Sequence, residues 1–207
     1  MASSPVQQIA AKAARLAALR PRASALPSLL FLTDPVRTPD PVAVARNLPP
    51  GTGVILRHYE EAGREELARA LAKICKQQRL VYLIGADATL ARQVGADGVH
   101  LPEARLREAG AIRLRHPNWL ITAAAHGRPA LRQAGAYQID AMLLAPVFGT
   151  ESHPGRPYLG PLRFRALVRN AQTPVYGLGG ITARSIGRLE GAQVAGVAVI
   201  GAAVGAS

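Results

Sequence analysis

Residues 173–182 read Thr-Pro-Val-Tyr-Gly-Leu-Gly-Gly-Ile-Thr, and residues 194–202 read Val-Ala-Gly-Val-Ala-Val-Ile-Gly-Ala. Each segment is a short apolar run that ends in small residues, at a point where a helix can begin. When two neighbouring parallel strands of an α/β barrel end in this way, their backbone N–H groups and the following helix N-termini form a site for one phosphate group. The sequence therefore predicts a phosphorylated small-molecule ligand, bound at Gly179, Gly180, Ile200, Gly201 and Ala202.

Six further apolar runs precede these two segments and alternate with helical stretches. The predicted strands are Leu29–Thr33, Val54–Arg57, Leu80–Ile84, Gly98–Leu101, Leu120–Ala124, Ala141–Ala145, Val175–Leu178 and Gly196–Ile200. The predicted helices between them include Arg64–Lys76, Ala88–Val94, Ala104–Arg115, Arg128–Ala134, Leu162–Arg169 and Ala183–Glu190. Eightfold strand–helix alternation without a linker indicates an α/β fold, a single (β/α)₈ TIM barrel.

Length and composition favour one domain over residues 1–207, because 49% of the 207 residues are apolar and only 18% are charged. Residues 28–205 form the predicted barrel, and residues 1–27 an N-terminal helix and its lead-in. Val6, Ile9, Ala13 and Leu16 follow helical spacing, which predicts an extra helix over Val6–Leu19 that covers the bottom of the barrel. An organelle transit peptide is the alternative for this Ala- and Arg-rich stretch.

The composition also limits the cellular setting and the partners. No apolar run reaches the length of about eighteen residues that a membrane span needs, so no membrane partner is expected. The single cysteine, Cys75, lies in a helical pattern and is expected to pack as a small hydrophobe, which fits the cytoplasm. The net charge of +12 is spread along the chain, and no nucleic-acid-binding motif appears, so nucleic acid is not expected. The sequence leaves the oligomeric state open, and a homo-oligomer is one of the alternatives.

Four motifs in order carry a family resemblance. They are Gly-Ala-Asp-Gly-Val-His-Leu at residues 95–101, Ala-Ala-His at 124–126, Ala-Pro-Val-Phe-Gly-Thr-Glu-Ser-His at 145–153, and Gly-Gly-Ile-Thr at 179–182. From residue 29 to residue 204 the chain resembles the thiamine phosphate synthase and thiazole tautomerase (TenI-like) family. The resemblance implies a (β/α)₈ barrel that binds thiazole phosphate. In the synthase branch it also implies transfer of a pyrimidine from its pyrophosphate to the thiazole phosphate, with magnesium.

The chain departs from the synthase pattern where the resemblance implies a magnesium site. Gly85 and Ala86 stand where the family has an Asn-Asp pair, with Asp87 one residue late. Arg105 stands where an aspartate is expected after a Gly-Gln-Glu-Asp-like turn. We therefore predict no resident metal, and magnesium only if synthase activity is retained. Asp87 or Glu103 in a shifted geometry is the alternative, although a lone carboxylate binds magnesium poorly.

The part of the site that would hold pyrophosphate is also reduced. Arg57 alone survives from the Gln-x-Arg-x-Lys run of the second strand, and Ala124 replaces a serine that synthases commonly carry. His153 replaces a lysine in the loop after the sixth strand, where Thr150 and Ser152 still offer hydroxyls. The remaining substrate-binding candidates here are therefore Arg57, Thr150 and Ser152.

His126, at the predicted end of the fifth strand, is the candidate catalytic residue, because imidazole exchanges protons near neutral pH. The alternative is that His126 only packs or bonds to a loop. His100 is expected to be structural, and the remaining histidines, His58, His116 and His153, are expected to lie solvated in loops, with contact to a ligand through the loop after the sixth strand as the alternative for His153.

Three functions remain open on these residues. The first is a metal-independent isomerase of the thiazole tautomerase type with His126 as acid and base. The second is a thiamine phosphate synthase, a transferase. The third is a non-catalytic paralogue that keeps the phosphate site and binds a thiamine precursor. An enzyme is favoured, and the types of residue present do not separate the first function from the third.

Overall fold

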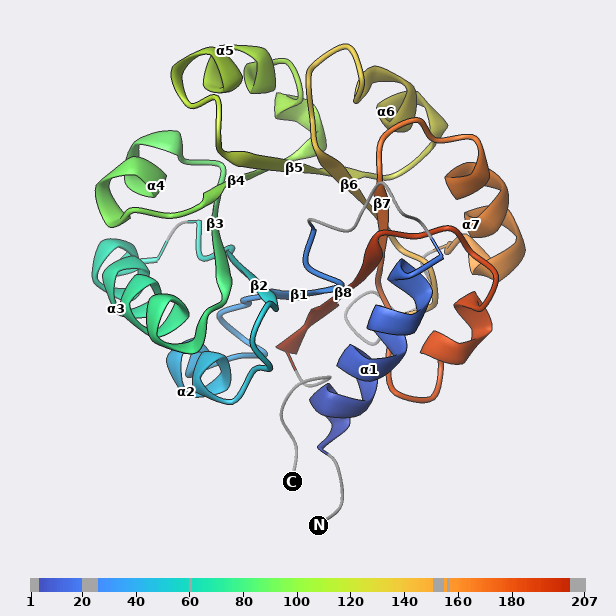
Figure 1. Cartoon of the computed structure of the whole chain (residues 1–207), viewed down its shortest axis with the longest axis horizontal. Coiled ribbons are helices and arrows are strands. Elements are labelled where there is room, and N and C mark those ends of the chain that lie inside the picture. The colour runs from blue at the N-terminus through green and yellow to red at the C-terminus, as the bar shows by residue number, and fades with distance from the viewer. Residues whose placement is uncertain (1–3, 20–25, 60, 151–154, 156, 202–207) are drawn as a thin grey trace.

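The computed structural model describes residues 4–19, 26–59, 61–150, 155 and 157–201, and these form a closed barrel of eight parallel strands (Figure 1). Each strand pairs with the next along the chain, and β8 closes the barrel on β1. The strands are β1 Leu29–Leu32, β2 Gly53–Leu56, β3 Val81–Gly85, β4 Gly98–Leu101, β5 Leu120–Ala125, β6 Ala141–Leu144, β7 Val175–Leu178 and β8 Gly196–Ile200. The (β/α)₈ prediction is thus confirmed, and every predicted strand lies within one residue of its observed bounds.

The helices form a ring outside the strands (Figure 1). They are α1 Pro5–Ala17, α2 Pro41–Arg46, α3 Arg64–Gln78, α4 Ala88–Val94, η2 Glu103–Arg105, α5 Glu108–Arg115, α6 Arg128–Gln133, α7 Gly160–Arg169 and η3 Ile186–Leu189, of which η2 and η3 are 3₁₀ helices. The prediction missed α2, a six-residue helix whose Asp40 caps Ala43 N–H at 2.8 Å. The single helix predicted over Ala104–Arg115 is in fact η2 followed by α5. The helix predicted over Ala183–Glu190 is only the short η3.

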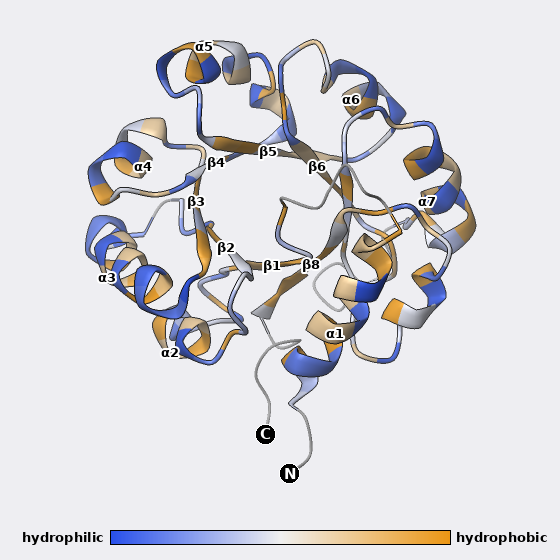
Figure 2. Cartoon of the chain, in the orientation of Figure 1, coloured by the Kyte–Doolittle hydropathy of each residue, from blue (hydrophilic) through white to orange (hydrophobic). Residues whose placement is uncertain are grey.

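Two apolar layers hold the barrel together. Leu30 and Leu32 of β1 point into the barrel and pack with inward residues of the other strands, while Leu29 and Phe31 pack against the helices. All four side chains of β1 are buried, two in each layer. Strands covered on both faces are mainly apolar, as the orange segments of the barrel in Figure 2 show, which is why short apolar runs predicted them well.

The N-terminal helix α1 is confirmed, but its place differs from the prediction. It contacts β1, β8 and η3, and its buried residues join the layer between the strands and the helices. It therefore covers the outer side of the barrel where β8 meets β1, a place that the single turn of η3 leaves open. At the bottom, Leu26 packs on the inner core, and the Tyr176 hydroxyl donates to Pro27 O at 2.6 Å.

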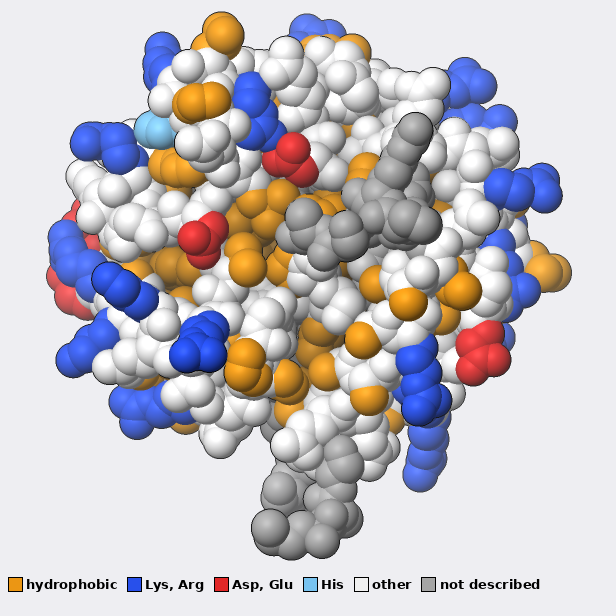
Figure 3. Space-filling view, in the orientation of Figure 1, with side chains coloured by type: hydrophobic (Ala, Val, Ile, Leu, Met, Phe, Trp, Pro, Cys, Tyr) orange, Lys and Arg blue, Asp and Glu red, His pale blue; other side chains and the backbone are white. Residues whose placement is uncertain are grey.

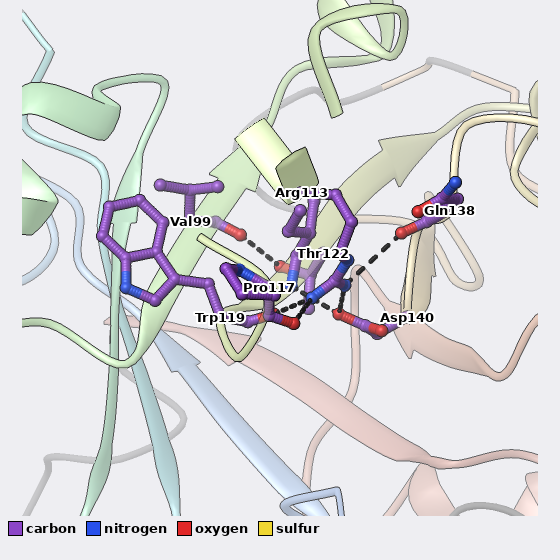
Figure 4. A network of polar contacts seen from close by, with 8 residues as sticks. Val99, Arg113, Pro117, Trp119, Thr122, Gln138 and Asp140 are labelled. Carbon is purple, nitrogen blue, oxygen red and sulfur yellow. Dashed lines mark hydrogen bonds and ion pairs between the residues drawn. The ribbon is translucent and has the colours of Figure 1, made fainter. Parts of the chain in front are cut away.

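An ion-pair network joins α5 to the amino-terminal ends of two strands (Figure 4). Asp140 precedes β6, and its Oδ2 accepts hydrogen bonds from Arg113 at 2.6 Å and from Ile121 N–H at 2.7 Å. Arg113 also donates to Trp119 O at 2.6 Å. Catalytic groups of such barrels lie at the opposite, carboxyl end of the strands, so this network is structural.

Burial and surface charge agree with two expectations from composition. Cys75 is buried, and burial, helped by the nearby Asp97 carboxylate, raises the pKa of its thiol to about 12, so it packs as a hydrophobe. Figure 3 shows lysine and arginine side chains dispersed around one face of the molecule rather than gathered in a patch. Within the described residues, no helix combines the length and apolar character needed to cross a membrane.

Candidate active site

The carboxyl ends of β7 and β8 lie side by side, because the two strands pair over Tyr176–Leu178 and Gly196–Ala198. Gly179 and Gly180 follow β7 with φ of 98° and 63°, and Gly201 follows β8 with φ of 58°. The strand pairs Leu32–Ile200 and Leu178–Ala198 extend the hydrogen-bond ladders up to Gly201 and Gly179, so of these three N–H groups only that of Gly180 lies outside a ladder without another acceptor among the described residues. A free N–H in a glycine-rich turn at the carboxyl end of a strand can contribute to an oxyanion site.

The packing of the loop after β6 gives Gly179 and Gly180 a steric reason to be glycine. A Cβ on Gly180 would lie 2.7 Å from Phe148 Cβ, and one on Gly179 would lie 3.0 Å from Pro146 Cα. The loop after β6 is held against them, since Phe148 N–H donates to Gly179 O at 3.1 Å. Glycine is therefore required at both positions by the packing of this loop.

The other predicted phosphate and substrate residues lie around the same strand ends, as far as the structure describes them. Ile200 ends β8 and is half-buried, and Thr150 lies half-buried in the loop after β6. Ser152 and Ala202 lie outside the described residues, as does His153. Ser185 shapes the turn after β7, because its Oγ donates to Gly180 O at 2.8 Å and accepts Thr182 N–H at 2.9 Å.

His126 directly follows β5 and is exposed. Its backbone N–H donates to Glu103 Oε2 at 2.7 Å, and its Nδ1 lies 3.3 Å from Ala145 O. A carbonyl oxygen only accepts, so in the neutral imidazole this contact places the proton on Nδ1 and the lone pair on Nε2. The imidazole is thus both bonded to a loop and able to accept a proton from a ligand.

Two further histidines, His58 and His100, are buried near the carboxyl ends of β2 and β4. His100 Nδ1 lies 3.0 Å from Thr122 Oγ1, and burial, with a smaller contribution from the Arg57 charge, lowers its pKa to about 3. His100 is therefore neutral and structural, as predicted. The expectation that His58 is solvated is wrong, because His58 is buried with Nδ1 2.9 Å from Thr33 Oγ1, and burial lowers its pKa. The chain turns inward immediately after β2, which the loop-like sequence did not reveal.

His116, expected to be solvated, stacks on Trp119 with ring centroids 3.7 Å apart. Arg57 is half-buried at the end of β2, and its charge acts on both His58 and His100. It forms no ion pair with any carboxylate in the described part of the chain. A half-buried guanidinium without an anionic partner is suited to an anionic ligand.

The residues at the metal position implied by the family do not fit a magnesium site. Arg105 donates to Ala86 O at 2.7 Å and forms a two-pronged ion pair with Glu108 at 2.5 and 2.6 Å. The hydrogen bond between Arg105 and Glu108 raises the pKa of Arg105 and lowers the pKa of Glu108. A guanidinium thus links the two loops that would have to supply carboxylates.

The two shifted carboxylates are engaged elsewhere. Asp87 caps α4 by accepting Leu90 N–H at 2.8 Å, and its other oxygen pairs with Arg64 at 3.2 Å. Glu103 accepts the His126 N–H. Across the described ranges, no three histidine, cysteine or acidic side chains gather in a way that could hold a metal ion.

Sequence reasoning did not find several contacts of this site. The Glu103–His126 and Arg105–Ala86 hydrogen bonds join residues 23 and 19 positions apart, and no local motif signals them. Arg37, in the loop after β1, packs against Gly201, which the sequence likewise does not indicate.

A closed parallel barrel with a histidine, an arginine and a glycine-rich turn at its carboxyl strand ends belongs to the class of (β/α)₈ barrels that carry active sites there. A family model described as thiamine monophosphate synthase matches residues 30–203. The chain belongs to this thiamine-biosynthesis family, which confirms the resemblance and the expectation of an enzyme.

Individual relatives agree with this assignment. A thiamine-phosphate synthase of Chlorobium luteolum is 33% identical over 180 residues, which cover 85% of this chain and 84% of the relative. One of Laribacter hongkongensis is 33% identical over 156 residues, which cover 73% and 74%. A thiamine phosphate pyrophosphorylase from Pyrococcus furiosus matches 90% of each chain with a TM-score of 0.74 at 23% identity, which shows the shared fold. These names fit the synthase alternative at least as well as the tautomerase.

Proposed function

We propose that the protein binds a phosphorylated thiazole and isomerises its ring by proton transfer, without a bound metal. The observation that carries this proposal is the Arg105 guanidinium bonded to Ala86 O and Glu108 at the place where a synthase of this family would need carboxylates. A cation approaching that place meets a positive charge rather than ligands.

The phosphate end of the ligand is assigned to the glycine-rich strand ends at Gly179, Gly180 and Gly201, where the Gly180 N–H has no acceptor among the described residues. Backbone donors that are already fixed in place bind an oxyanion without reorganising. The thiazole ring would then extend across the barrel mouth toward β5, where His126 lies.

His126 would transfer the proton through Nε2, while Nδ1–H stays bonded to Ala145 O. Nε2 takes a proton from one position of the ligand and returns it to another, so the imidazole ends in its starting state and no co-reactant is consumed. Glu103 accepts the backbone N–H of His126 and so fixes the backbone position from which the imidazole side chain extends.

The second candidate is a thiamine phosphate synthase, favoured by the names of the relatives from Chlorobium luteolum and Laribacter hongkongensis. In that case Arg57 and Thr150 would bind the pyrophosphate oxygens. Magnesium would neutralise the leaving pyrophosphate, but the residues after β3 and β4 do not supply its ligands.

Calorimetric titration with thiazole phosphate and with pyrimidine pyrophosphate, each with and without magnesium, separates the candidates when combined with a turnover assay. Magnesium-independent binding and isomerisation of thiazole phosphate is the expected result. Magnesium-dependent formation of thiamine phosphate would overturn the proposal in favour of the synthase. Binding of thiazole phosphate without any turnover would identify the non-catalytic binder.

A further inference from the structure

The turn after β7 runs from Gly180 to Ser185, and its backbone is held by two hydroxyl groups. Ser185 Oγ donates to Gly180 O at 2.8 Å and accepts the Thr182 N–H at 2.9 Å. The Thr182 hydroxyl in turn accepts the N–H groups of Arg184 at 3.3 Å and of Ser185 at 3.1 Å. Ser185 therefore ties the last residue of this turn to its first.

The hydrogen bond to Gly180 O also decides where the next N–H group points. Gly180 O and the Ile181 N–H belong to one peptide group, which is trans, since Ala145–Pro146 is the only cis peptide bond among the described residues. The C=O and N–H of a planar trans peptide point in opposite directions. Because Ser185 holds Gly180 O toward its own hydroxyl, the Ile181 N–H points away from Ser185.

The Ile181 N–H is a donor on a nearly buried residue. Neither this group nor the Gly180 N–H donates to another group in the part of the chain that the structure describes. Ile181 is only 4% exposed, because its side chain packs in the layer between the strands and the helices. Buried backbone N–H groups are nearly always paired, and an unpaired one costs free energy. The left-handed φ of 63° at Gly180 is of the kind that lets successive N–H groups converge on one anion.

We propose that Ser185 is a positioning residue for phosphate binding, which aims the Ile181 N–H, together with that of Gly180, at a phosphate oxygen. The Thr182 N–H takes no part, because Ser185 Oγ already accepts it. Without the hydroxyl, the Gly180–Ile181 peptide group would gain freedom to rotate, and binding would have to order it. This inference rests on the proposed function for the presence of a phosphate at this turn, but not for the identity of the thiazole.

The test compares Ser185→Ala, Ser185→Thr and Thr52→Val with the parent. Alanine removes the hydroxyl from the turn, and threonine keeps it. Thr52 directly precedes β2, at the opposite end of the strands from the proposed site, and its Oγ1 donates to Pro49 O at 2.7 Å. Thr52→Val therefore removes the same kind of hydrogen bond at a distant place. Thermal unfolding midpoints check that all four proteins are folded.

Calorimetry with thiazole phosphate should give a dissociation constant about five- to tenfold higher for Ser185→Ala than for the parent and Thr52→Val. Ser185→Thr should bind more tightly than Ser185→Ala, because it keeps the hydroxyl. The affinity of Ser185→Ala for the unphosphorylated thiazole alcohol should change less than about twofold, whereas a general loss of structure would weaken both ligands. Parental affinity of Ser185→Ala for thiazole phosphate would overturn the proposal, as would an equal loss for the alcohol or equal affinities of the two Ser185 variants.

Inorganic phosphate separates this proposal from the proposed function. In the parent it should shift the amide NMR signals of Gly180 and Ile181, and in Ser185→Ala the same shift of Ile181 should need about five- to tenfold more phosphate. If this dependence on Ser185 holds while thiazole phosphate fails to bind, the thiazole assignment is wrong and Ser185 still positions a phosphate donor. If phosphate shifts neither signal in the parent, or shifts Ile181 equally in both proteins, the Ser185 proposal is overturned.

Discussion

At the scale of single residues, the chemistry of the site depends on which polar groups are already used by the protein. Asp87, Glu103 and Arg105 all lie at the mouth, yet each is engaged by a helix cap, a backbone N–H or an ion pair. Within the described part of the chain, the groups left free are the Nε2 atom of His126, the Arg57 guanidinium and the Gly180 N–H. The free groups, rather than the residue types, favour binding of an anion and proton transfer over metal-assisted displacement.

His126→Asn is expected to lower the isomerisation rate by about a hundredfold or more, because asparagine cannot take up the proton. The affinity for thiazole phosphate should change less than about twofold, since the phosphate donors lie on β7 and β8. Asparagine can still donate to Ala145 O in the manner of Nδ1–H, so the loop contact is preserved. Single-turnover kinetics and calorimetry measure the two quantities, and a parental rate in the variant would rule out His126 as the acid and base.

The buried His100 is expected to make stability depend on pH in acid. Its folded pKa of about 3 lies below the ordinary value of 6.5, so below pH 6.5 the unfolded chain binds a proton that the folded protein does not. The free energy of unfolding should therefore fall as the pH is lowered from 6.5 toward 3, with a slope of about 1.4 kcal/mol per pH unit from this group.

His58 acts in the same direction, because burial also lowers its pKa. Urea unfolding at a series of pH values measures the slope for the parent and for His100→Asn, which keeps a polar atom near Thr122 Oγ1. The variant should show a shallower fall over this range. An unchanged slope would mean that His100 is protonated in the folded protein, contrary to its burial.

At the scale of elements, the strands were predictable because both of their faces are buried. The runs Leu29–Leu32 and Val175–Leu178 lack alternation, and their shortness between turn signals favours strands of a covered parallel sheet over helices. The short helices were harder, because α2 and η3 span six and four residues and show less than two turns of periodicity. The position of α1 was not predictable, because its spacing identifies an apolar face but not what covers that face.

The packing of α1 on β1 and β8 predicts that this helix contributes to the stability of the barrel. Ile9 is 1% exposed, and Ile9→Ala should lower the free energy of unfolding by about 2–4 kcal/mol through lost burial and the cavity left behind. Lys12→Ala, on the same helix, removes a surface hydrogen bond to Ala183 O and should cost less than about 1 kcal/mol. Urea denaturation measures both, and an Ile9→Ala effect as small as that of Lys12→Ala would mean that α1 is only loosely docked.

At the scale of the whole molecule, the sequence predicted the barrel and the strand ends that carry the site, but not the contacts between loops. The barrel follows from local patterns repeated eight times, each readable alone. The Arg105–Ala86, Glu103–His126 and Arg37–Gly201 contacts each join two different loops of the rim, so they depend on how the whole barrel closes. This is why the free and the occupied groups of the site emerged only from the structure.

The loop contacts around the rim lead to a prediction about magnesium. Chelation with EDTA, or addition of millimolar magnesium, should leave both thiazole phosphate binding and isomerisation unchanged, because Arg105 links the loops after β3 and β4 where carboxylates would have to stand. Mn²⁺, followed by paramagnetic broadening of NMR signals, should bind the double variant Ala86→Asp, Arg105→Asp more tightly than the parent, since the variant has one carboxylate on each of the two loops. Magnesium-stimulated turnover in the parent would show that the metal-independent assignment is wrong. The same conclusion would follow if signals of residues near position 86 broadened at the same Mn²⁺ concentration in the parent as in the variant, because the native loops would then already hold a cation.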